Sequence, residues 1–366
     1  PQEKRKSIGR KEKTGGVLMN IKAQDLMDLM EEWAPAALAE SWDHPGLQVG
    51  NPEEPVKKVM ISLDLTEQNV ERACKEGVSM IISHHPFLFK SLHRIDLSTY
   101  KGRVIEKLIC HHVLSFAAHT NLDTAREGVN DALADALELT ERQGLLTEKR
   151  EPLLKVAAYV EFVKARECKA LLEKKYKGRA GHFYLLGDAD DSSRMGKMEF
   201  NAASSALQEV MEDVRRICGD VHCDLYELKN GASFEYMGRL GKLPHPMKGK
   251  KALFYIKEKL GIPDLRYAGN TDIIVRQVAV LGGAGSEFAS LAKAKGADLY
   301  LTGDLKYHEA QDAAAMGLLI ADGGHFYTER VIVPKLAERI RKEAEKRHWD
   351  LEVLEDTGAE DIFSHL

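Results

Sequence analysis

Four short segments of this sequence bring histidine and carboxylate side chains together at close spacing. Each segment closely follows a run of apolar residues, and none contains cysteine. Imidazole and carboxylate groups are ligands of zinc, iron and manganese. Because a metal centre draws its ligands from several loops, the four segments together predict a metal site better than any one of them. They contribute His84 and His85, His119 and Asp123, Asp304 and His308, and His325 and Glu329.

Two of these pairs have spacings that suit metal ligands. If His325 and Glu329 lie in the first turns of a helix, their i,i+4 spacing puts both side chains on one face, ~6 Å apart. Such a pair can ligate one ion, or its carboxylate can bridge two. Adjacent residues such as His84 and His85 point to opposite faces of an extended strand. Pro86 fixes the exit of the chain at this strand end, however, and there the two rings could each serve a different ion.

Other interpretations stay open at this stage. A single histidine at a strand end more often forms a structural hydrogen bond than it binds a metal. Gly282-Gly283-Ala284-Gly285 lies between a strand and a helix, as a phosphate-binding loop does, but it lacks the full G-x-G-x-x-G pattern and a following lysine. The serine nucleophile of a G-x-S-x-G motif is excluded, because the sequence contains no such segment.

Short apolar strands alternate with helices in two stretches of the chain, which predicts an α/β fold with a mostly parallel sheet. In such sheets ligands bind beyond the carboxyl ends of the strands, where the histidines and carboxylates lie. The strands expected are Val59–Leu63, Met80–Ile82 and Leu114–Ala118 in the first stretch, and Val278–Leu281, Leu299–Leu301 and Leu318–Ile320 in the second. The first two strands of the two halves superpose at a constant offset of 219 positions, with Val59 on Val278. We interpret the halves as an internal repeat.

A third unit of different order separates the two halves. Its pattern predicts β-α-β-β-α-β, the order of a ferredoxin-like α+β unit. We therefore predict a discontinuous α/β core domain of residues 21–150 and 231–366, with an inserted domain of residues 151–230. Residues 1–20 are basic and non-periodic, and we expect a flexible arm there, with Met19 as an alternative start.

The composition of the 366 residues is that of a folded chain without a strong charge. Hydrophobic residues make up 44 % and charged residues 30 %, and the net charge of −5 gives no electrostatic drive toward nucleic acid. No apolar stretch reaches the ~18 residues of a membrane span, and the basic N-terminal segment lacks the apolar region of a secretory signal. Five scattered cysteines without a C-x-x-C spacing predict a reduced, cytoplasmic protein.

The segments that carry these histidines resemble the motifs of the Nif-three-like proteins, which are also called GTP cyclohydrolase 1 type 2 homologues. Four motifs occur in the right order, and the resemblance covers both halves, roughly residues 20–145 and 232–366. The motifs are Ser83-His84-His85-Pro86, His119-Thr120-Asn121-Leu122-Asp123, Thr302-Gly303-Asp304 and Gly324-His325-Phe326-Tyr327-Thr328-Glu329.

The resemblance implies a centre of two divalent ions, with zinc, iron or manganese as the metal. Asp123 and Glu329 would be bridging carboxylates, and the other implied ligands are His84, His85 and His325. It also implies a homohexameric ring of dimers whose metal sites face an inner cavity. Some members carry a PII-like domain of β-α-β-β-α-β order in the middle of the chain. The inserted unit here matches that position and order, but lacks the Gly-rich, Cys-containing stretch of the usual insert.

Two functions stay open. One is a metal-dependent hydrolase of a nucleotide or related phosphate compound, of the cyclohydrolase or phosphoesterase type. His119, His308 and Asp304 are then candidates to orient the ligands or to transfer a proton. The other is a non-catalytic metal-binding or regulatory oligomer, with the insert as a sensor or assembly domain. An open coordination position would favour catalysis, whereas a centre closed by protein ligands would favour a structural role.

Overall fold

The computed structural model of this chain describes residues 18–176, 180–186 and 195–364. It divides into two compact units, of which the first runs up to Leu145 and resumes at Gly238, while the second is Leu146–Met237. Most of the predicted arm, residues 1–17, lies outside the described residues. Met19, which was expected in that arm, instead pairs with Trp349 in a parallel bridge.

The first unit contains a five-stranded sheet whose strands follow the order β15-β4-β5-β6-β2. The first four strands in this order are parallel, and β2 runs antiparallel to β6. The strands are β2 (Gly46–Val49), β4 (Lys58–Ser62), β5 (Met80–Ser83), β6 (Leu114–Ala117) and β15 (Glu352–Glu355). A separate antiparallel pair joins β1 (Ile21–Lys22) to β3 (Pro55–Val56).

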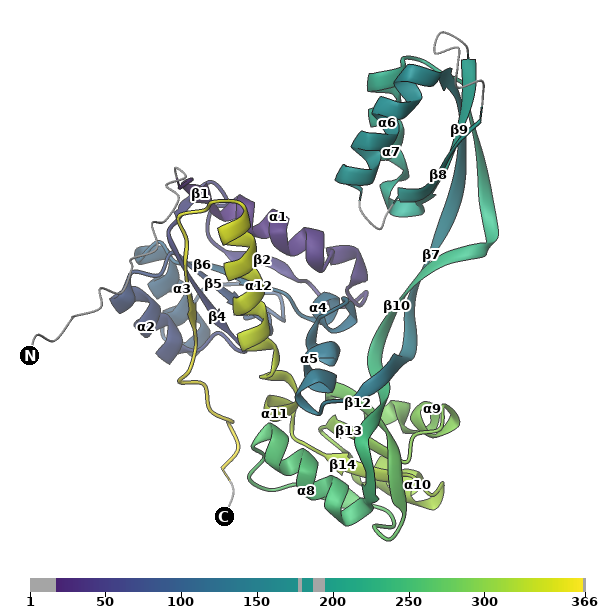
Figure 1. The fold of residues 1–366 in the computed structure, drawn as a ribbon. Helices are drawn as coiled ribbons and strands as arrows, with labels where there is room; N and C mark the ends of the chain where they lie inside the picture. Colours follow the sequence, from purple (N-terminus) through teal and green to yellow (C-terminus); the bar gives the residue numbers. More distant parts are fainter. Residues whose placement is uncertain (1–17, 177–179, 187–194, 365–366) are drawn as a thin grey trace, which may run out of the picture. The chain divides into compact units, whose positions relative to one another are not determined.

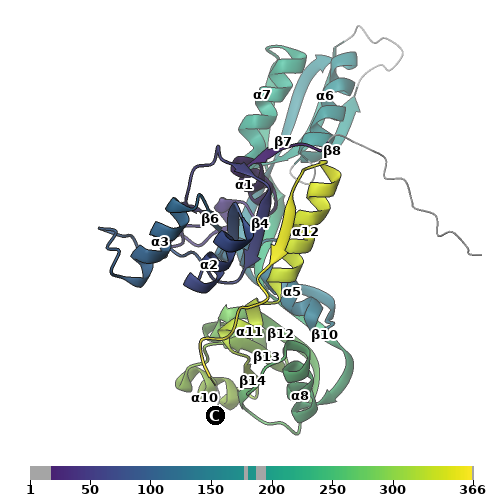
Figure 2. The same cartoon turned by 90° about the vertical axis from the view of Figure 1, so that its left-hand side faces the viewer.

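Helices cover both faces of this sheet (Figure 1). Val59 and Ile61 of β4 share one core with the apolar faces of α1 and α12. Met60 between them shares the opposite core with α2 and α3, because successive side chains of a strand alternate between faces. The helices are α1 (Ala23–Trp33), α2 (Glu67–Glu76), α3 (Tyr100–Cys110) and α12 (Ile332–Lys346). Figure 2 shows α12 and α2 in a view turned by 90°.

The termini of α2 illustrate how the local sequence sets these elements. The Thr66 hydroxyl accepts a hydrogen bond from the Asn69 backbone N–H and so caps the first turn. The helix ends at Gly77, which has the left-handed conformation that glycine adopts without a Cβ penalty (φ 67°).

The second sheet begins in the same unit, and its strands follow the order β11-β14-β13-β12-β10-β7-β9-β8. Within it β12, β13 and β14 are parallel, whereas β11 and β10 flank them antiparallel. These strands are β11 (Arg266–Ala268), β12 (Ile274–Ala284), β13 (Leu299–Gly303), β14 (Leu319–Asp322) and β10 (Cys223–Lys248). Their core is completed by α5 (Val129–Ala136) and α8 (Gly249–Leu260), while α9 (Ala289–Ala294) and α10 (Tyr307–Ala315) follow β12 and β13.

The internal repeat is confirmed by the register of the strands. Val59 pairs with Met80 in the first sheet, and Val278 pairs with Leu299 in the second, so the pairing recurs at the predicted spacing of 219. Each half therefore places the ends of three parallel strands at one edge. The antiparallel strands β2, β10 and β11 extend the predicted parallel arrangement at its sides.

The second unit has the order β7 (Thr140–Glu161), α6 (Phe162–Lys175), β8 (Ala180–Leu186), β9 (Met195–Ala203), α7 (Leu207–Cys218) and β10. This is the β-α-β-β-α-β order expected from the sequence, and both helices share one core with the strands. The predicted ends of the insert, at residues 151 and 230, lie inside the long strands β7 and β10. Pairing of β7 with β9 starts at Leu153, so Pro152 removes no hydrogen bond from that ladder.

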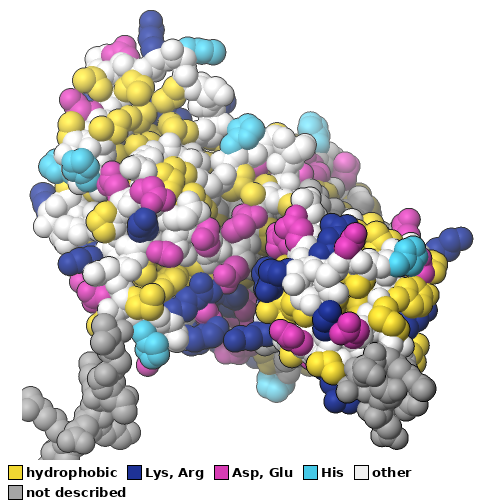
Figure 3. Space-filling view, turned by 90° about the horizontal axis from the view of Figure 1, so that it is seen from above, with side chains coloured by type: hydrophobic (Ala, Val, Ile, Leu, Met, Phe, Trp, Pro, Cys, Tyr) yellow, Lys and Arg dark blue, Asp and Glu magenta, His cyan; other side chains and the backbone are white. Residues whose placement is uncertain are grey.

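Acidic and basic side chains alternate with apolar ones over the face drawn in Figure 3, rather than forming a field of one sign. Among the described residues, no helix has both the length and the apolar character needed to cross a bilayer.

Candidate metal centre

The carboxyl ends of the parallel strands in both halves carry the residues of the candidate centre. His84 and His85 directly follow β5. His119 is the residue before α4 (Thr120–Thr124), which follows β6 and contains Asp123. His325 and Glu329 are the first and last residues of α11 (His325–Glu329), which follows β14.

Six side chains converge there in three overlapping groups. Within each group, one potential ligand atom per residue lies within 4.8 Å of the others. Each group alone has the composition of a binding site for a metal ion. The groups are His84, His85 and His119; His85, His325 and Glu329; and His84, Asp123 and Glu329.

Glu329 lies at the middle of the cluster with its two carboxylate oxygens facing different histidines. Its Oε2 atom is 2.9 Å from His85 Nε2 and 3.1 Å from His325 Nε2. Its Oε1 atom is 3.8 Å from His84 Nε2, which in turn is 3.7 Å from Asp123 Oδ1. The carboxylate can therefore serve two neighbouring positions at once.

Several of these atoms are buried without a hydrogen bond of normal geometry. They are His84 Nε2, His85 Nε2, Asp123 Oδ1 and Glu329 Oε2. His85 Nε2 and Glu329 Oε2 still form an ion pair at 2.9 Å, whereas His84 Nε2 and Asp123 Oδ1 have no hydrogen-bond partner. Leaving a polar atom buried and unpaired costs about 1–3 kcal/mol, so these two atoms need a compensating partner. A divalent cation is such a partner, because it accepts lone pairs from imidazole and carboxylate alike. The residues present therefore fit a metal centre.

The other ring nitrogen of each histidine is held by a neighbouring group. The Nδ1–H of His84 donates to the Ala118 carbonyl at 2.8 Å, which leaves Nε2 with its lone pair in the neutral ring. His85 Nδ1 lies 2.7 Å from Asp64 Oδ1, and His325 Nδ1 lies 2.8 Å from Asp304 Oδ2. Carboxylate or carbonyl partners of this kind orient metal-binding histidines and raise their basicity.

His119 has the same arrangement, with its Nδ1 3.0 Å from Asp43 Oδ1. Asp43 is itself buried and accepts hydrogen bonds at Oδ2 from the backbone and hydroxyl of Thr120. Burial raises the pKa of Asp43, but His119 and Thr120 outweigh burial and lower the pKa to about 2. Asp43 is therefore ionised and holds the His119 ring in place.

The metal-free cluster binds protons strongly. Burial lowers the pKa of His85, but Asp64 and Glu329 outweigh it and raise the pKa to about 10. Burial lowers the pKa of His325 too, but Glu329 and Asp304 outweigh burial and raise this pKa to about 9. Both rings are therefore protonated at neutral pH until a cation displaces their protons.

The pKa values of the two carboxyl groups in the cluster, Asp123 and Glu329, shift in opposite directions. Burial raises the pKa of Asp123 to about 6, an effect that the nearby Glu329 charge reinforces and His84 opposes. Burial acts on Glu329 too, but His325, His84 and His85 surround it and hold its pKa well below the usual value. Glu329 is thus the permanent anion around which the histidines gather.

The glycine-rich loop after β12 lies against Glu329, and two of its backbone N–H groups have partners within the protein. Gly282 N–H donates to Asn130 Oδ1, and Gly283 N–H donates to the Thr328 hydroxyl, so both donors are already used. Gly283 has φ 64°, and a Cβ there would collide with Glu329 Oε1. The glycine lets the backbone approach the carboxylate closely.

The structure brings together most of the residues singled out in the sequence. The five implied ligands converge, His119 joins them, and Asp304 contacts His325. His308 does not join the cluster, because it lies exposed on α10 with its ring against Tyr307. Sequence reasoning missed the partners Asp43, Asp64 and Asn130, although Asp64 follows β4 as closely as His85 follows β5.

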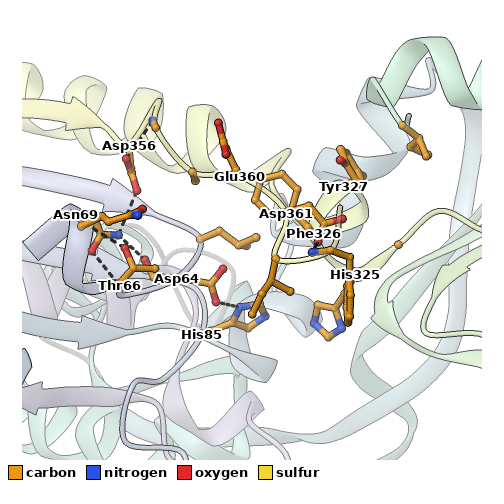
Figure 4. Close-up of a pocket in the computed structure, with 18 of the residues that line it drawn as sticks. Asp64, Thr66, Asn69, His85, His325, Phe326, Tyr327, Asp356, Glu360 and Asp361 are labelled. Atoms are coloured by element: carbon orange, nitrogen blue, oxygen red, sulfur yellow. Dashed lines mark hydrogen bonds and ion pairs between the residues drawn. The ribbon is translucent and has the colours of Figure 1, made fainter. Parts of the chain in front are cut away.

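A cleft of about 1340 Å³ opens beside the cluster, with His85 and His325 on its lining (Figure 4). Among its charged lining residues, carboxylates outnumber cations. The carboxylates are Asp64, Asp264, Asp304, Asp322, Asp356, Glu360 and Asp361. Apart from histidine, the described lining residues include two cations, and each is paired with a wall carboxylate: Arg72 with Asp356 and Arg266 with Asp322. The cleft therefore disfavours a ligand part with several negative charges.

Comparisons with known proteins give a consistent relationship over nearly the whole chain. The sequence profile described as Duf34/NIF3 (NGG1p interacting factor 3) matches residues 21–359. A Bacillus subtilis (strain 168) protein named GTP cyclohydrolase 1 type 2 homolog is 35 % identical over 339 residues, covering 86 % of this chain and 90 % of that protein.

Solved structures agree with the sequence relationship. A Bacillus cereus protein related to NIF3 superposes with a TM-score of 0.84 at 31 % identity, covering 95 % of this chain and 99 % of the other. A Staphylococcus aureus protein superposes with a TM-score of 0.78 at 28 % identity, covering 94 % of this chain and 99 % of the other.

Proposed function

Because this chain belongs to the Duf34/NIF3 family, we propose that it is a hydrolase whose centre holds two divalent ions. The observation that carries the proposal is the position of Glu329, whose oxygens face two different ligand groups. One ion would lie among His84, Asp123 and Glu329, and the other among His85, His325 and Glu329. Five side chains shared by two ions leave positions for water or substrate, which favours catalysis over a structural role.

A pair of divalent ions supplies a strong nucleophile at neutral pH and stabilises charge on the attacked group. The chain's own residues would orient the ligand rings and transfer protons to and from the substrate. Asp64 and Asp304 orient the rings of His85 and His325 through Nδ1. His119, backed by the ionised Asp43, is the group placed to take up or give a proton beside the centre.

We propose a nucleotide or a related phosphate compound as the substrate, which agrees with the name of the Bacillus subtilis relative. Opening of a purine imidazole ring and cleavage of a phosphoester are both within reach of such a centre. The acidic walls of the cleft favour a substrate with little negative charge away from the reacting group. We therefore expect a nucleoside or monophosphate to bind better than a triphosphate.

The first test is the metal content and the hydrolytic activity of the purified protein. We expect about two ions per chain in the wild type and a loss of both in Asp123→Ala combined with Glu329→Ala. Asp264→Ala is the matched control, because it removes a wall carboxylate of the cleft that lies outside the three groups. A metal-loaded wild type without turnover of any nucleotide or phosphoester would exclude the hydrolase. A wild type without metal would exclude the centre itself.

We also propose, from the family resemblance, that the protein is a cytoplasmic homo-oligomer, with a hexamer of dimers as the expected form. The exposed apolar side chains of Ile95 and Leu97, shortly before α3, support an assembly surface. If the metals served only such an assembly, the protein would be a structural metal-binding oligomer. Light scattering of the native and metal-stripped protein separates these cases, because only a structural role makes the particle mass depend on metal.

A further inference from the structure

We propose that Trp42 and Phe89 form, with His119, a binding site for a planar heteroaromatic ring at the edge of the metal centre. The proposal rests on the proposed function, since it names the part of the substrate that this side of the centre recognises. It assigns a role to two residues that the metal chemistry does not use.

The three rings form a corner. The Trp42 and Phe89 centroids are 5.8 Å apart with 66° between the ring planes. Both rings face His119, at 6.0 Å and 70° for Trp42 and at 6.2 Å and 82° for Phe89. Because the planes are steeply inclined to one another, a flat ligand ring can stack on one of them while the edges of the other two contact its rim.

This corner adjoins the cluster of potential ligands directly. The His119 ring lies 5.4 Å from the ring of His84 and 5.6 Å from the ring of His85. A ring held against Trp42 and Phe89 would therefore sit one side chain away from the reacting positions. Phe89, Trp42 and His119 come from three different segments of the chain, so their meeting is a property of the fold and not of one loop.

Both aromatic rings beside His119 are exposed. Trp42 is 55 % exposed and Phe89 is 49 % exposed, whereas the other tryptophans, Trp33 and Trp349, are 8 % and 9 % exposed. Large aromatic rings are normally buried, and their exposure beside a candidate centre marks a binding surface. Stacking on a base is the use that such rings find in many nucleotide-binding sites.

Both rings stand on anchored backbone, as a preformed site requires. Asp43, the neighbour of Trp42, is buried and bonded to Thr120 and His119. The backbone N–H of Leu88, the neighbour of Phe89, donates to the Gln48 side chain at 3.1 Å. Ordering these segments therefore costs little when a ligand binds.

The test measures the binding of guanosine, inorganic phosphate and choline to the metal-loaded full chain by calorimetry. The variants are Trp42→Ala, Phe89→Ala and the conservative Trp42→Phe, with Phe254→Ala as the control, because Phe254 is 55 % exposed on α8. We expect Trp42→Ala and Phe89→Ala each to weaken guanosine binding about 5- to 150-fold. Phosphate binding and metal content should stay unchanged, Trp42→Phe should restore most of the affinity, and Phe254→Ala should match the wild type.

Three outcomes would overturn the proposal. They are guanosine affinity unchanged within two-fold in both alanine variants, binding of choline but not of guanosine, and a changed particle mass in the alanine variants, which would assign the rings to a subunit interface. The proposed function is judged separately, from metal content and turnover. Guanosine binding is also followed by the part of the tryptophan emission that acrylamide quenches, because Trp42 is the exposed tryptophan.

Discussion

Replacing Gly283 by alanine tests how closely the loop after β12 must approach Glu329. Two costs add in this variant. The left-handed backbone (φ 64°) penalises any Cβ by about 1–2 kcal/mol. The new Cβ would also collide with Glu329 Oε1 and lie 3.2 Å from His325 Nε2, which adds about 1–3 kcal/mol of overpacking. We therefore expect a loss of about 2–5 kcal/mol in the free energy of unfolding.

The chain offers a matched control for the backbone cost. Gly77 has nearly the same φ, 67°, but a Cβ there meets nothing within 4 Å. Gly77→Ala should therefore cost only the left-handed penalty of about 1–2 kcal/mol, and it should leave the metal content intact. Urea unfolding of the metal-free proteins gives the two stabilities, and elemental analysis gives the ions per chain.

The difference between the two variants isolates the contact with Glu329. We expect Gly283→Ala to lose metal as well as stability, because the displaced carboxylate faces both ligand groups. If Gly283→Ala matched Gly77→Ala in both stability and metal content, the idea that the loop fixes Glu329 would be refuted.

Three further predictions follow from the same contacts. Asp304→Asn should weaken metal binding about 10–100-fold without changing the urea midpoint, because Asp304 only orients His325; an unchanged affinity by metal competition would contradict this. Filling the centre at pH 7 should release about two protons per chain, one each from His85 and His325, whose pKa values are about 10 and about 9. Calorimetry in two buffers measures this release, which should fall toward zero as the pH passes 10. Asp213→Asn should destabilise the second unit by about 2 kcal/mol at pH 7, since Asp213 accepts 2.7 Å hydrogen bonds from Lys175 and Tyr176. These donors hold the Asp213 pKa below its usual value despite burial, so the wild type should lose this advantage as the pH falls through the carboxyl range in denaturation curves.

Residues directly after strands were the part of the site that could be predicted. An apolar run of strand length predicts where a parallel strand ends, and His84, His85 and His325 each follow such a run. The partners behind the rings could not be predicted in this way. Asp43 lies in a loop without periodicity, and its contact with His119 spans 76 positions of sequence. His308 is a candidate from the sequence that does not join the site. Its side chain is exposed on α10, and the sequence does not show in which direction this helix runs.

The boundaries of the insert show a different limit of local patterns. The predicted insert ended at residues 151 and 230, beside Pro152 and Gly231, and both residue types are rare inside strands. In the structure β7 and β10 continue through these positions. Strand pairing over many residues outweighs one unfavourable residue, and no short window of sequence shows which partner strand is present.

The position of β15 has a consequence for the order in which the chain can fold. This strand pairs with β4, and α12 just before it supplies Ile332, Leu336 and Ile340 to the core that covers the first sheet. During synthesis β4 leaves the ribosome some 270 residues before α12 does. Until then one face of the first sheet is covered by α1 without α12, and the β4 edge lacks its partner strand. Pairing over such a separation is slow. The nascent protein should therefore stay open to proteases and chaperones until its last helix has emerged.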